Sequence, residues 1–91
     1  MWFVYILKCA DGSLYTGITT DPKRRFQEHL SGKGGHYTRS HKPIKQVYQE
    51  SLETRNEALK REFEIKSWSR ERKLVFLERT QISQKQTLSQ A

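Results

Sequence analysis

Residues 3–19 constrain the fold of this chain more than any other segment, because they have the pattern of a β-hairpin. Two runs rich in β-branched and aromatic residues flank the pair Asp11-Gly12, which is typical of a tight turn between antiparallel strands. Side chains alternate between the two faces of a strand, so the length of the turn decides which residues share a face.

A two-residue turn at Asp11-Gly12 would place Tyr5 and Tyr15 on opposite faces of the sheet. A three-residue loop over 10–12, with Gly12 in the left-handed conformation, would gather four residues on one face: Tyr5, Leu7, Tyr15 and Gly17. We predict the three-residue loop.

The composition indicates one small basic domain. The chain has 91 residues, of which 34% are hydrophobic, so it has room for a single thin core. Its 17 Lys and Arg against 10 Asp and Glu give a net charge of +7. This balance favours polyanionic partners such as nucleic acid or an anionic membrane surface. The alternative is a protein that is basic without such a partner.

The one cysteine, Cys9, cannot form an internal disulfide, which fits a reducing compartment. The N-terminal residues lack the basic start and the long apolar run of a signal peptide. No run reaches the ~20 apolar residues that span a bilayer. We therefore expect a cytoplasmic protein.

The rest of the chain alternates between strand and helix patterns. The first strand is apolar on both faces, as expected at the centre of a covered sheet. Asp21-Pro22 and the capping box at 54–57 are typical helix starts. We predict strands over 2–8, 14–19 and 44–50, and helices over 22–31, 55–67 and 70–80. This order, β-β-α-β-α-α, predicts an α+β fold with a three-stranded, mostly antiparallel sheet flanked by helices. We expect one domain over 1–80 and a flexible tail over 81–91.

The first predicted helix and the segment after it carry most of the candidate polar residues. Phe26 and Leu30 lie one turn apart and form the predicted buried stripe, with Arg25 and His29 on its flank. The segment 32–43 begins with glycines and has cations but no acidic residue. We predict a loop there that stays mobile until it binds a partner.

Glu62 lies on the apolar side of the predicted helix 55–67, between Ala58 and Ile65. A carboxylate in such a place must be paired, protonated or bound to a cation, because burying a lone charge is costly. An ion pair with Lys66 or Arg25 and a metal-binding role are both consistent with this position.

Taken singly, the other candidates are ambiguous. Tyr5 and Tyr15 are ordinary strand residues, and Arg25 and His29 suit an exposed helix edge. Gly17 is less usual, because a glycine inside a strand often marks the close approach of a ligand or another backbone. The three histidines and the cysteine lack the spacing of a structural zinc site.

Together, these residues resemble the GIY-YIG nuclease domain, and in particular its small stand-alone members. Phe3-Val4-Tyr5 keeps the tyrosine of the first family motif, and Tyr15-Thr16-Gly17 keeps the tyrosine and glycine of the second. Arg25 matches the catalytic arginine of the family, and His29 matches the aromatic residue or histidine one turn later. Glu62 matches the metal-binding glutamate.

The chain also departs from the family pattern at two places. Phe3 stands where the first motif has glycine, and no asparagine follows Ser67, where larger members carry one. The resemblance, which spans residues 1–80, implies an endonuclease that hydrolyses phosphodiester bonds in DNA rather than RNA. A structured or branched DNA substrate and a role in DNA repair are both consistent with the resemblance.

The resemblance implies a role for each residue. Glu62 would hold one Mg²⁺ or Mn²⁺ ion, and Arg25 would stabilise the negative charge of the transition state. Tyr5 or Tyr15 would orient or deprotonate the attacking water, or His29 would act as the base, since its ordinary pKa of ~6.5 suits that task. Six residues would contact the nucleic-acid backbone, namely Lys33, Tyr37, Arg39, Lys42, Lys60 and Lys66.

Two other functions are consistent with the sequence. The basic surface would serve a nucleic-acid-binding module in which catalysis is weak or lost, and an interaction domain would take its specificity from a protein partner. The nuclease hypothesis requires Tyr5 and Tyr15 on one face beside Arg25, His29 and Glu62, which is why we predict the three-residue loop.

Overall fold

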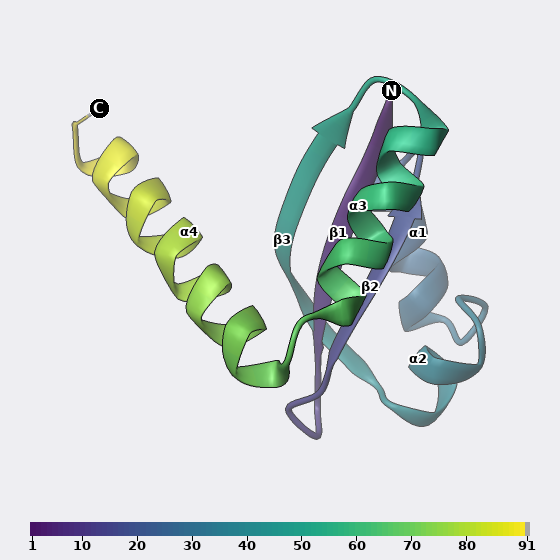
Figure 1. Cartoon of the computed structure of the whole chain (residues 1–91). Helices are drawn as coiled ribbons and strands as arrows, with labels where there is room; N and C mark the ends of the chain where they lie inside the picture. Colours follow the sequence, from purple (N-terminus) through teal and green to yellow (C-terminus); the bar gives the residue numbers. More distant parts are fainter. Residues whose placement is uncertain (91) are drawn as a thin grey trace.

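The chain folds into a three-stranded sheet with helices on both of its faces (Figure 1). The computed structural model describes the backbone of residues 1–90 and the side chains of residues 1–80. The strands are β1 (Trp2–Cys9), β2 (Leu14–Thr19) and β3 (Pro43–Leu52). The helices are α1 (Pro22–Leu30), α2 (His36–Ser40), α3 (Arg55–Ser67) and α4 (Arg70–Gln90). The predicted α+β fold class is confirmed.

The strand order is β2-β1-β3, and both strand pairs are antiparallel. The hairpin register pairs Tyr5 with Gly17 and Leu7 with Tyr15. Residues 10–12 form the connecting loop, across which the Cys9 N–H donates to the Ser13 carbonyl at 2.9 Å. Gly12 has a φ of 86°. The three-residue loop, its left-handed glycine and the central place of β1 are all as predicted.

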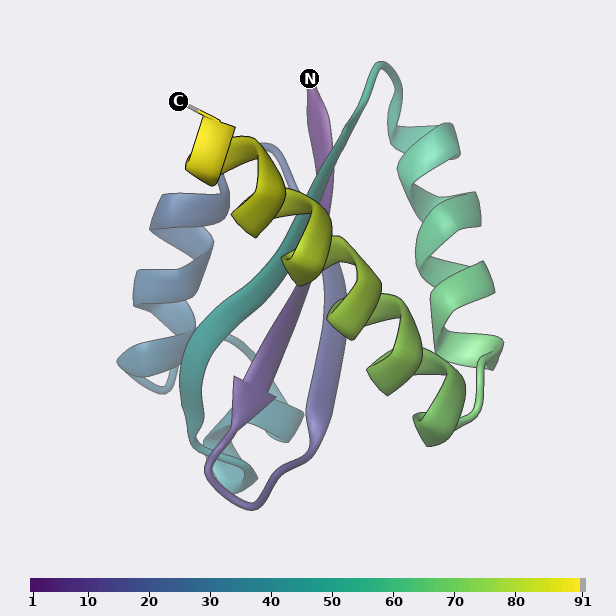
Figure 2. The ribbon, with the colours of Figure 1, turned by 90° about the vertical axis from the view of Figure 1, so that its left-hand side faces the viewer.

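β1 divides its side chains between two faces of the sheet. Val4 and Ile6 point to the side covered by α3 and α4, where they form a core with Ala58, Ile65 and Leu77. Tyr5 points to the other side, where it contacts α1. Figure 2 shows α1 and α3 on opposite sides of the strands. We call the side of Val4 and Ile6 the aliphatic face, and the side of Tyr5 the phenolic face.

Two predicted helix starts are present with their caps. The Asp21 side chain accepts a hydrogen bond from the Arg24 N–H, and Pro22 occupies the first helical position of α1. The Thr54 side chain likewise accepts from the Glu57 N–H at the start of α3. These bonds satisfy backbone donors that a helix leaves free at its N-terminus, and they fix where both helices begin.

The predicted buried stripe of α1 is wrong in its rotation about the helix axis. His29 is 1% exposed, whereas Leu30 is 46% exposed. Two apolar residues in a nine-residue helix provide little area to set its rotation. The hydrogen bonds of the His29 ring, described with the site, instead hold this side of α1 against the sheet.

The segment 32–43, predicted as a loop, contains the short helix α2. Thr38 in this helix is 3% exposed. A helix of five residues has no apolar period that a sequence reveals, and its stability comes from tertiary contact. The expected ordering of this segment on binding stays a prediction.

α4 continues to Gln90, beyond the predicted helix end at residue 80. Within its first turns, Leu77 is 6% exposed and Phe76 packs against the aliphatic core. Ala91 and the side chains of 81–90 lie outside the described residues, so the flexibility expected of the tail stays a prediction.

Candidate active site

Two tyrosines and a glycine of the hairpin form the floor of the phenolic face. The ring centroids of Tyr5 and Tyr15 lie 6.2 Å apart. A β-carbon at Gly17 would fall 2.6 Å from Tyr5 Oη and 2.8 Å from Tyr5 Cζ. The close approach that a strand glycine predicts is therefore made by the Tyr5 side chain, and not by a ligand or another backbone.

His29 reaches the tyrosines from α1. Its Nε2 lies 2.8 Å from Tyr5 Oη, and its Nδ1 lies 2.8 Å from Thr38 Oγ1 of α2. Tyr5, His29 and Thr38 are 2%, 1% and 3% exposed. They form a continuous hydrogen-bonded series, the buried triad, in which both nitrogens of the imidazole have partners.

Burial shifts the pKa values of the two rings in opposite directions, because it disfavours the charged form of each. It raises the pKa of the Tyr5 phenol, and Tyr15 raises it further. It lowers the pKa of His29, and the positive charge of Arg25 adds to this effect. Tyr5 is therefore a neutral phenol at pH 7, next to a neutral imidazole that retains one proton-accepting nitrogen.

Arg25 lies one turn before His29 on α1, and its side chain is 31% exposed. Its Nη1 donates to Glu28 Oε1 at 3.1 Å, and its Nη2 donates to the Gly34 carbonyl at 3.1 Å. Burial lowers the pKa of Arg25, but hydrogen bonds with Glu28 and with the Tyr5 phenol raise it above its usual value. The guanidinium thus connects α1 to the segment before α2.

The backbone at Gly34 packs directly against His29. A β-carbon at Gly34 would fall 2.0 Å from His29 Nδ1 and 2.6 Å from Cγ. Any other residue at this position would displace the imidazole or the segment itself. The segment before α2 is therefore part of the wall that holds His29.

Aromatic contacts continue from Tyr15 to the surface. The ring centroids of Tyr15 and Tyr37 lie 5.5 Å apart, and Tyr37 stacks on His41 with centroids 4.1 Å apart. His41 Nε2 lies 3.7 Å from Asp11 Oδ2 in the hairpin loop. Tyr37 is 37% exposed. It shares this segment with three exposed cations, namely Lys33, Arg39 and Lys42.

Glu62 lies on α3, which packs on the aliphatic face. Its side chain is 19% exposed, and its Oε2 lies 3.2 Å from Lys66 Nζ, one of the two ion pairs that the sequence left open. Arg25, the other partner considered, pairs with Glu28 instead. Among residues 1–80, no ion pair joins Glu62 to Arg25 or His29, and no group of three or more His, Cys, Asp and Glu side chains could hold a metal ion.

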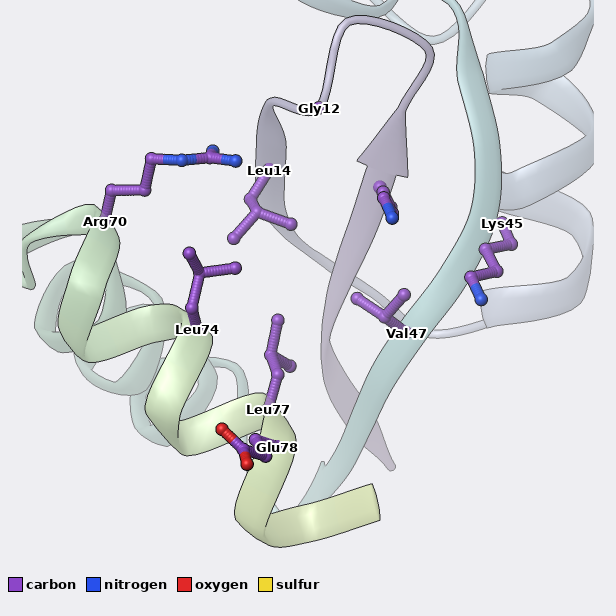
Figure 3. Close-up of a pocket in the computed structure, with 9 residues that line it drawn as sticks. Gly12, Leu14, Lys45, Val47, Arg70, Leu74, Leu77 and Glu78 are labelled. Atoms are coloured by element: carbon purple, nitrogen blue, oxygen red, sulfur yellow. The ribbon is translucent and has the colours of Figure 1, made fainter. Parts of the chain in front are cut away.

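A separate pocket opens on the aliphatic face, between α4 and the end of the hairpin (Figure 3). Leu14, Val47, Leu74 and Leu77 line it together with Gly12, three cations and one carboxylate, namely Lys8, Lys45, Arg70 and Glu78. In Figure 3 the Arg70 side chain extends toward the hairpin. None of the predicted site residues lines this pocket, so it is distinct from the phenolic face.

The structure thus brings together four of the five residues predicted as catalytic, namely Tyr5, Tyr15, Arg25 and His29. Glu62 is not among them: it lies on α3, which packs on the aliphatic face, and its ion pair is with Lys66. Sequence reasoning missed Glu28, Gly34 and Thr38. The spacing of Glu28 from Arg25 on one helix was a usable signal. Gly34 and Thr38 gave none, because their roles depend on how the unrecognised helix α2 packs.

Comparison with known proteins places the chain in a family. The model of the GIY-YIG catalytic domain matches residues 1–74. The chain belongs to the GIY-YIG family. This membership supports a nuclease-type function and action on nucleic acid.

Relatives of this GIY-YIG domain cover most of its length. The UPF0213 protein H16_B0156 of Cupriavidus necator is 56% identical over 75 residues, which are 82% of each chain. A UPF0213 protein of Staphylococcus aureus is 54% identical over 72 residues, which are 79% of this chain and 88% of that one.

Two solution NMR structures resemble the fold. The UPF0213 protein BH0048 from Bacillus halodurans is 44% identical, with a TM-score of 0.56 over 86% of this chain and 84% of that one. The protein EF2693 from E. faecalis is 41% identical, with a TM-score of 0.59 over 88% and 85% of the two chains. Within the described residues, every helix is too short or too polar to cross a membrane.

Proposed function

We propose that this GIY-YIG domain is a metal-dependent endonuclease that hydrolyses phosphodiester bonds in DNA, including structured or branched DNA. The observation that carries the proposal is the cluster of Tyr5, Tyr15, Arg25 and His29 beside a basic segment. Phosphodiester hydrolysis needs a water that loses its proton and a positive group that stabilises the charge on the phosphate. This cluster offers both.

Arg25 supplies the positive charge. Glu28 and the Gly34 carbonyl hold two of its nitrogens, which fixes the plane of the guanidinium. Its side chain remains 31% exposed, so the other donors are accessible to phosphate oxygens. A guanidinium held in this way needs little reorganisation when charge develops in the transition state.

The phenols and His29 handle the proton. Tyr15 is the more exposed of the two tyrosines and meets the attacking water. The water gives a proton to the Tyr15 oxygen, Tyr15 gives its proton to the Tyr5 oxygen, and Tyr5 gives its proton to His29 Nε2. His29 does not contact the water itself, because its ring is buried and both nitrogens are engaged. The sequence allowed either a tyrosine phenol or His29 as the base. The geometry favours a phenol that contacts the water and His29 as the group that accepts the proton from the phenols.

Glu62 suits a single Mg²⁺ or Mn²⁺ ion. Such ions keep several waters and bind through one or two carboxylates together with substrate phosphates, which fits a lone, partly exposed carboxylate. The Lys66 side chain that pairs with it is 53% exposed and is able to move away. When bound, the cation would polarise the phosphate and stabilise the leaving oxygen. We expect the ion to bind with DNA rather than before it.

The basic residues hold the DNA backbone from two sides. Tyr37 packs against Tyr15 and shares its segment with the exposed residues Lys33, Arg39 and Lys42. Lys60 and Lys66 lie on α3. These contacts are to phosphates and carry no sequence code. The cytoplasm, where Cys9 would stay reduced, is the expected location.

The Glu62–Lys66 ion pair also favours a second candidate function, a nucleic-acid-binding module with weak or no catalysis. If the lysine is not displaced, no carboxylate is available for the cation. This alternative predicts salt-sensitive binding of DNA without metal-dependent cutting.

The test is cleavage of branched, single-stranded and duplex DNA in Mg²⁺ or Mn²⁺ by the full chain. We expect Glu62→Gln and Arg25→Ala each to reduce the cutting rate by about 100-fold or more, because each removes a group that stabilises the transition state. Chelation of the metal should stop cutting by the unaltered protein.

Glu64→Gln is the matched control. Glu64 also lies on α3 and also pairs with a basic residue, Arg61, but it has no proposed role in the reaction. Cutting that is unaffected by Glu62→Gln, or reduced equally by Glu64→Gln, would contradict the proposal. DNA binding without any cutting would favour the binding module.

A further inference from the structure

Thr38 is the inner end of the buried triad and the one buried residue of α2. Its Oγ1 lies 2.8 Å from His29 Nδ1. We propose that Thr38 is a positioning residue, which holds the proton of the neutral His29 ring on Nδ1 and leaves Nε2 to accept the Tyr5 hydroxyl. Its importance for catalysis rests on the proposed nuclease function, whereas the position of the proton does not.

The Tyr5 end of the triad fixes the direction of the first hydrogen bond. Tyr5 Oη lies 2.8 Å from His29 Nε2. A phenol, with its ordinary pKa of ~10, is a stronger hydrogen-bond donor than the aliphatic hydroxyl of Thr38. The Tyr5 O–H therefore donates to His29 Nε2, which requires a lone pair on that nitrogen.

The Thr38 end completes the arrangement. A neutral imidazole with a lone pair on Nε2 carries its proton on Nδ1, and this N–H needs an acceptor because the ring is 1% exposed. Thr38 Oγ1 is the polar atom within hydrogen-bond distance. Gly34 packs against the same nitrogen, where a β-carbon would not fit.

The same contact suits the charged ring that forms when Tyr5 passes its proton to Nε2. An imidazolium donates from both nitrogens, and Thr38 accepts from Nδ1 in either state. Without that acceptor, the proton of the neutral ring would move to Nε2 and donate to Tyr5. His29 would then offer no lone pair to the phenol.

The direct test is ¹⁵N NMR of the His29 ring in the full chain at pH 8. We expect the unaltered protein to carry the proton on Nδ1, Thr38→Val to move it to Nε2, and Thr38→Ser, which restores the hydroxyl, to return it to Nδ1. In the nuclease assay, Thr38→Val should cut about 10–100-fold more slowly, by analogy with the loss of a group that orients a functional histidine. Thr38→Ser should restore most of the rate.

The outcomes separate this inference from the proposed function. A proton on Nε2 in the unaltered protein would overturn the inference, and this measurement needs no variant. An unchanged ring in a folded Thr38→Val protein would overturn it as well. The expected NMR changes in a protein that cuts no DNA would instead leave Thr38 as the positioning residue and refute the nuclease. A cutting rate that falls equally in Thr38→Val and Thr38→Ser would assign Thr38 a packing role only.

Discussion

The aliphatic and phenolic faces of β1 are equally buried but are held by different forces. Val4 and Ile6 are both 0% exposed, and Tyr5 and His29 are 2% and 1% exposed. The first pair contributes through apolar area removed from water, which has no preferred direction. The second pair depends on hydrogen bonds, which need particular atoms at particular distances.

This difference decides what each face can do. An aliphatic core tolerates changes in shape if its volume is kept. A buried polar series does not, because a lost partner leaves a buried group unsatisfied. On the phenolic face, small changes therefore alter the hydrogen bonds, and with them the chemistry of the site, as well as stability. Three predictions test this contrast.

The largest effect is expected from Ile6→Ala on the aliphatic face. Removing a fully buried isoleucine side chain should destabilise the protein by about 2–5 kcal/mol, because it leaves a cavity. Thermal unfolding should then occur roughly 10 °C lower or more. Ile44→Ala is the control, since Ile44 is 56% exposed. Equal losses in the two variants would show that the aliphatic face is not the main source of stability.

A smaller effect is expected from Gly17→Ala on the phenolic face. The new β-carbon would fall 2.6 Å from Tyr5 Oη, so the ring must move, at a cost of about 1–3 kcal/mol. The Tyr5–His29 hydrogen bond should be lost, which NMR of the His29 ring would detect. Gln49→Ala, at the exposed position opposite Tyr5 on β3, should leave both stability and the His29 signals unchanged. Unchanged His29 signals in Gly17→Ala would show that Gly17 is not needed for the Tyr5–His29 hydrogen bond.

The smallest effect concerns pH. The folded-state pKa of His29 lies below its unfolded value of 6.5, chiefly because of burial. The unfolded state therefore binds more protons below about pH 6.5, and stability should fall as the pH decreases through that value and toward the folded pKa. Urea unfolding between pH 8 and 5 measures this, and His29→Gln should reduce the slope. His36→Gln, at an exposed histidine of α2, should leave the slope unchanged. If stability depends on pH in the same way in His29→Gln as in the unaltered protein, the loss of stability at low pH comes from titratable groups other than His29.

The hairpin was predictable because its signals are local. Asp11-Gly12 marks the turn, and alternation fixes the faces once the loop length is chosen. The central place of β1 also follows from its sequence, since a strand that is apolar on both sides needs cover on both. Residues that are close in the chain carry all of this information.

The surroundings of His29 were not predictable in this way. The rotation of α1, which buries His29 and exposes Leu30, depends on contacts with Tyr5 and with the later residue Thr38. The helix α2 exists in the context of those contacts and has no pattern of its own. Glu62 shows the same limit, because its sequence position indicated a partly buried carboxylate but left its partner open. Spatial neighbours from separate elements decide such details.

The three-residue loop at 10–12 has a consequence for how this hairpin can change during evolution. Asp11 pairs with His41, but no side chain of the loop takes part in the aliphatic core or in the buried triad. The loop residues are therefore replaceable wherever Gly12 keeps its backbone conformation. The length of the loop cannot change by one residue. One inserted residue would move Tyr15 and Gly17 to the aliphatic face, and Leu14 and Ile18 to the phenolic face. Both the core and the site would fail together. Lineages of this domain should therefore vary the composition of the loop freely but change its length only in steps of two.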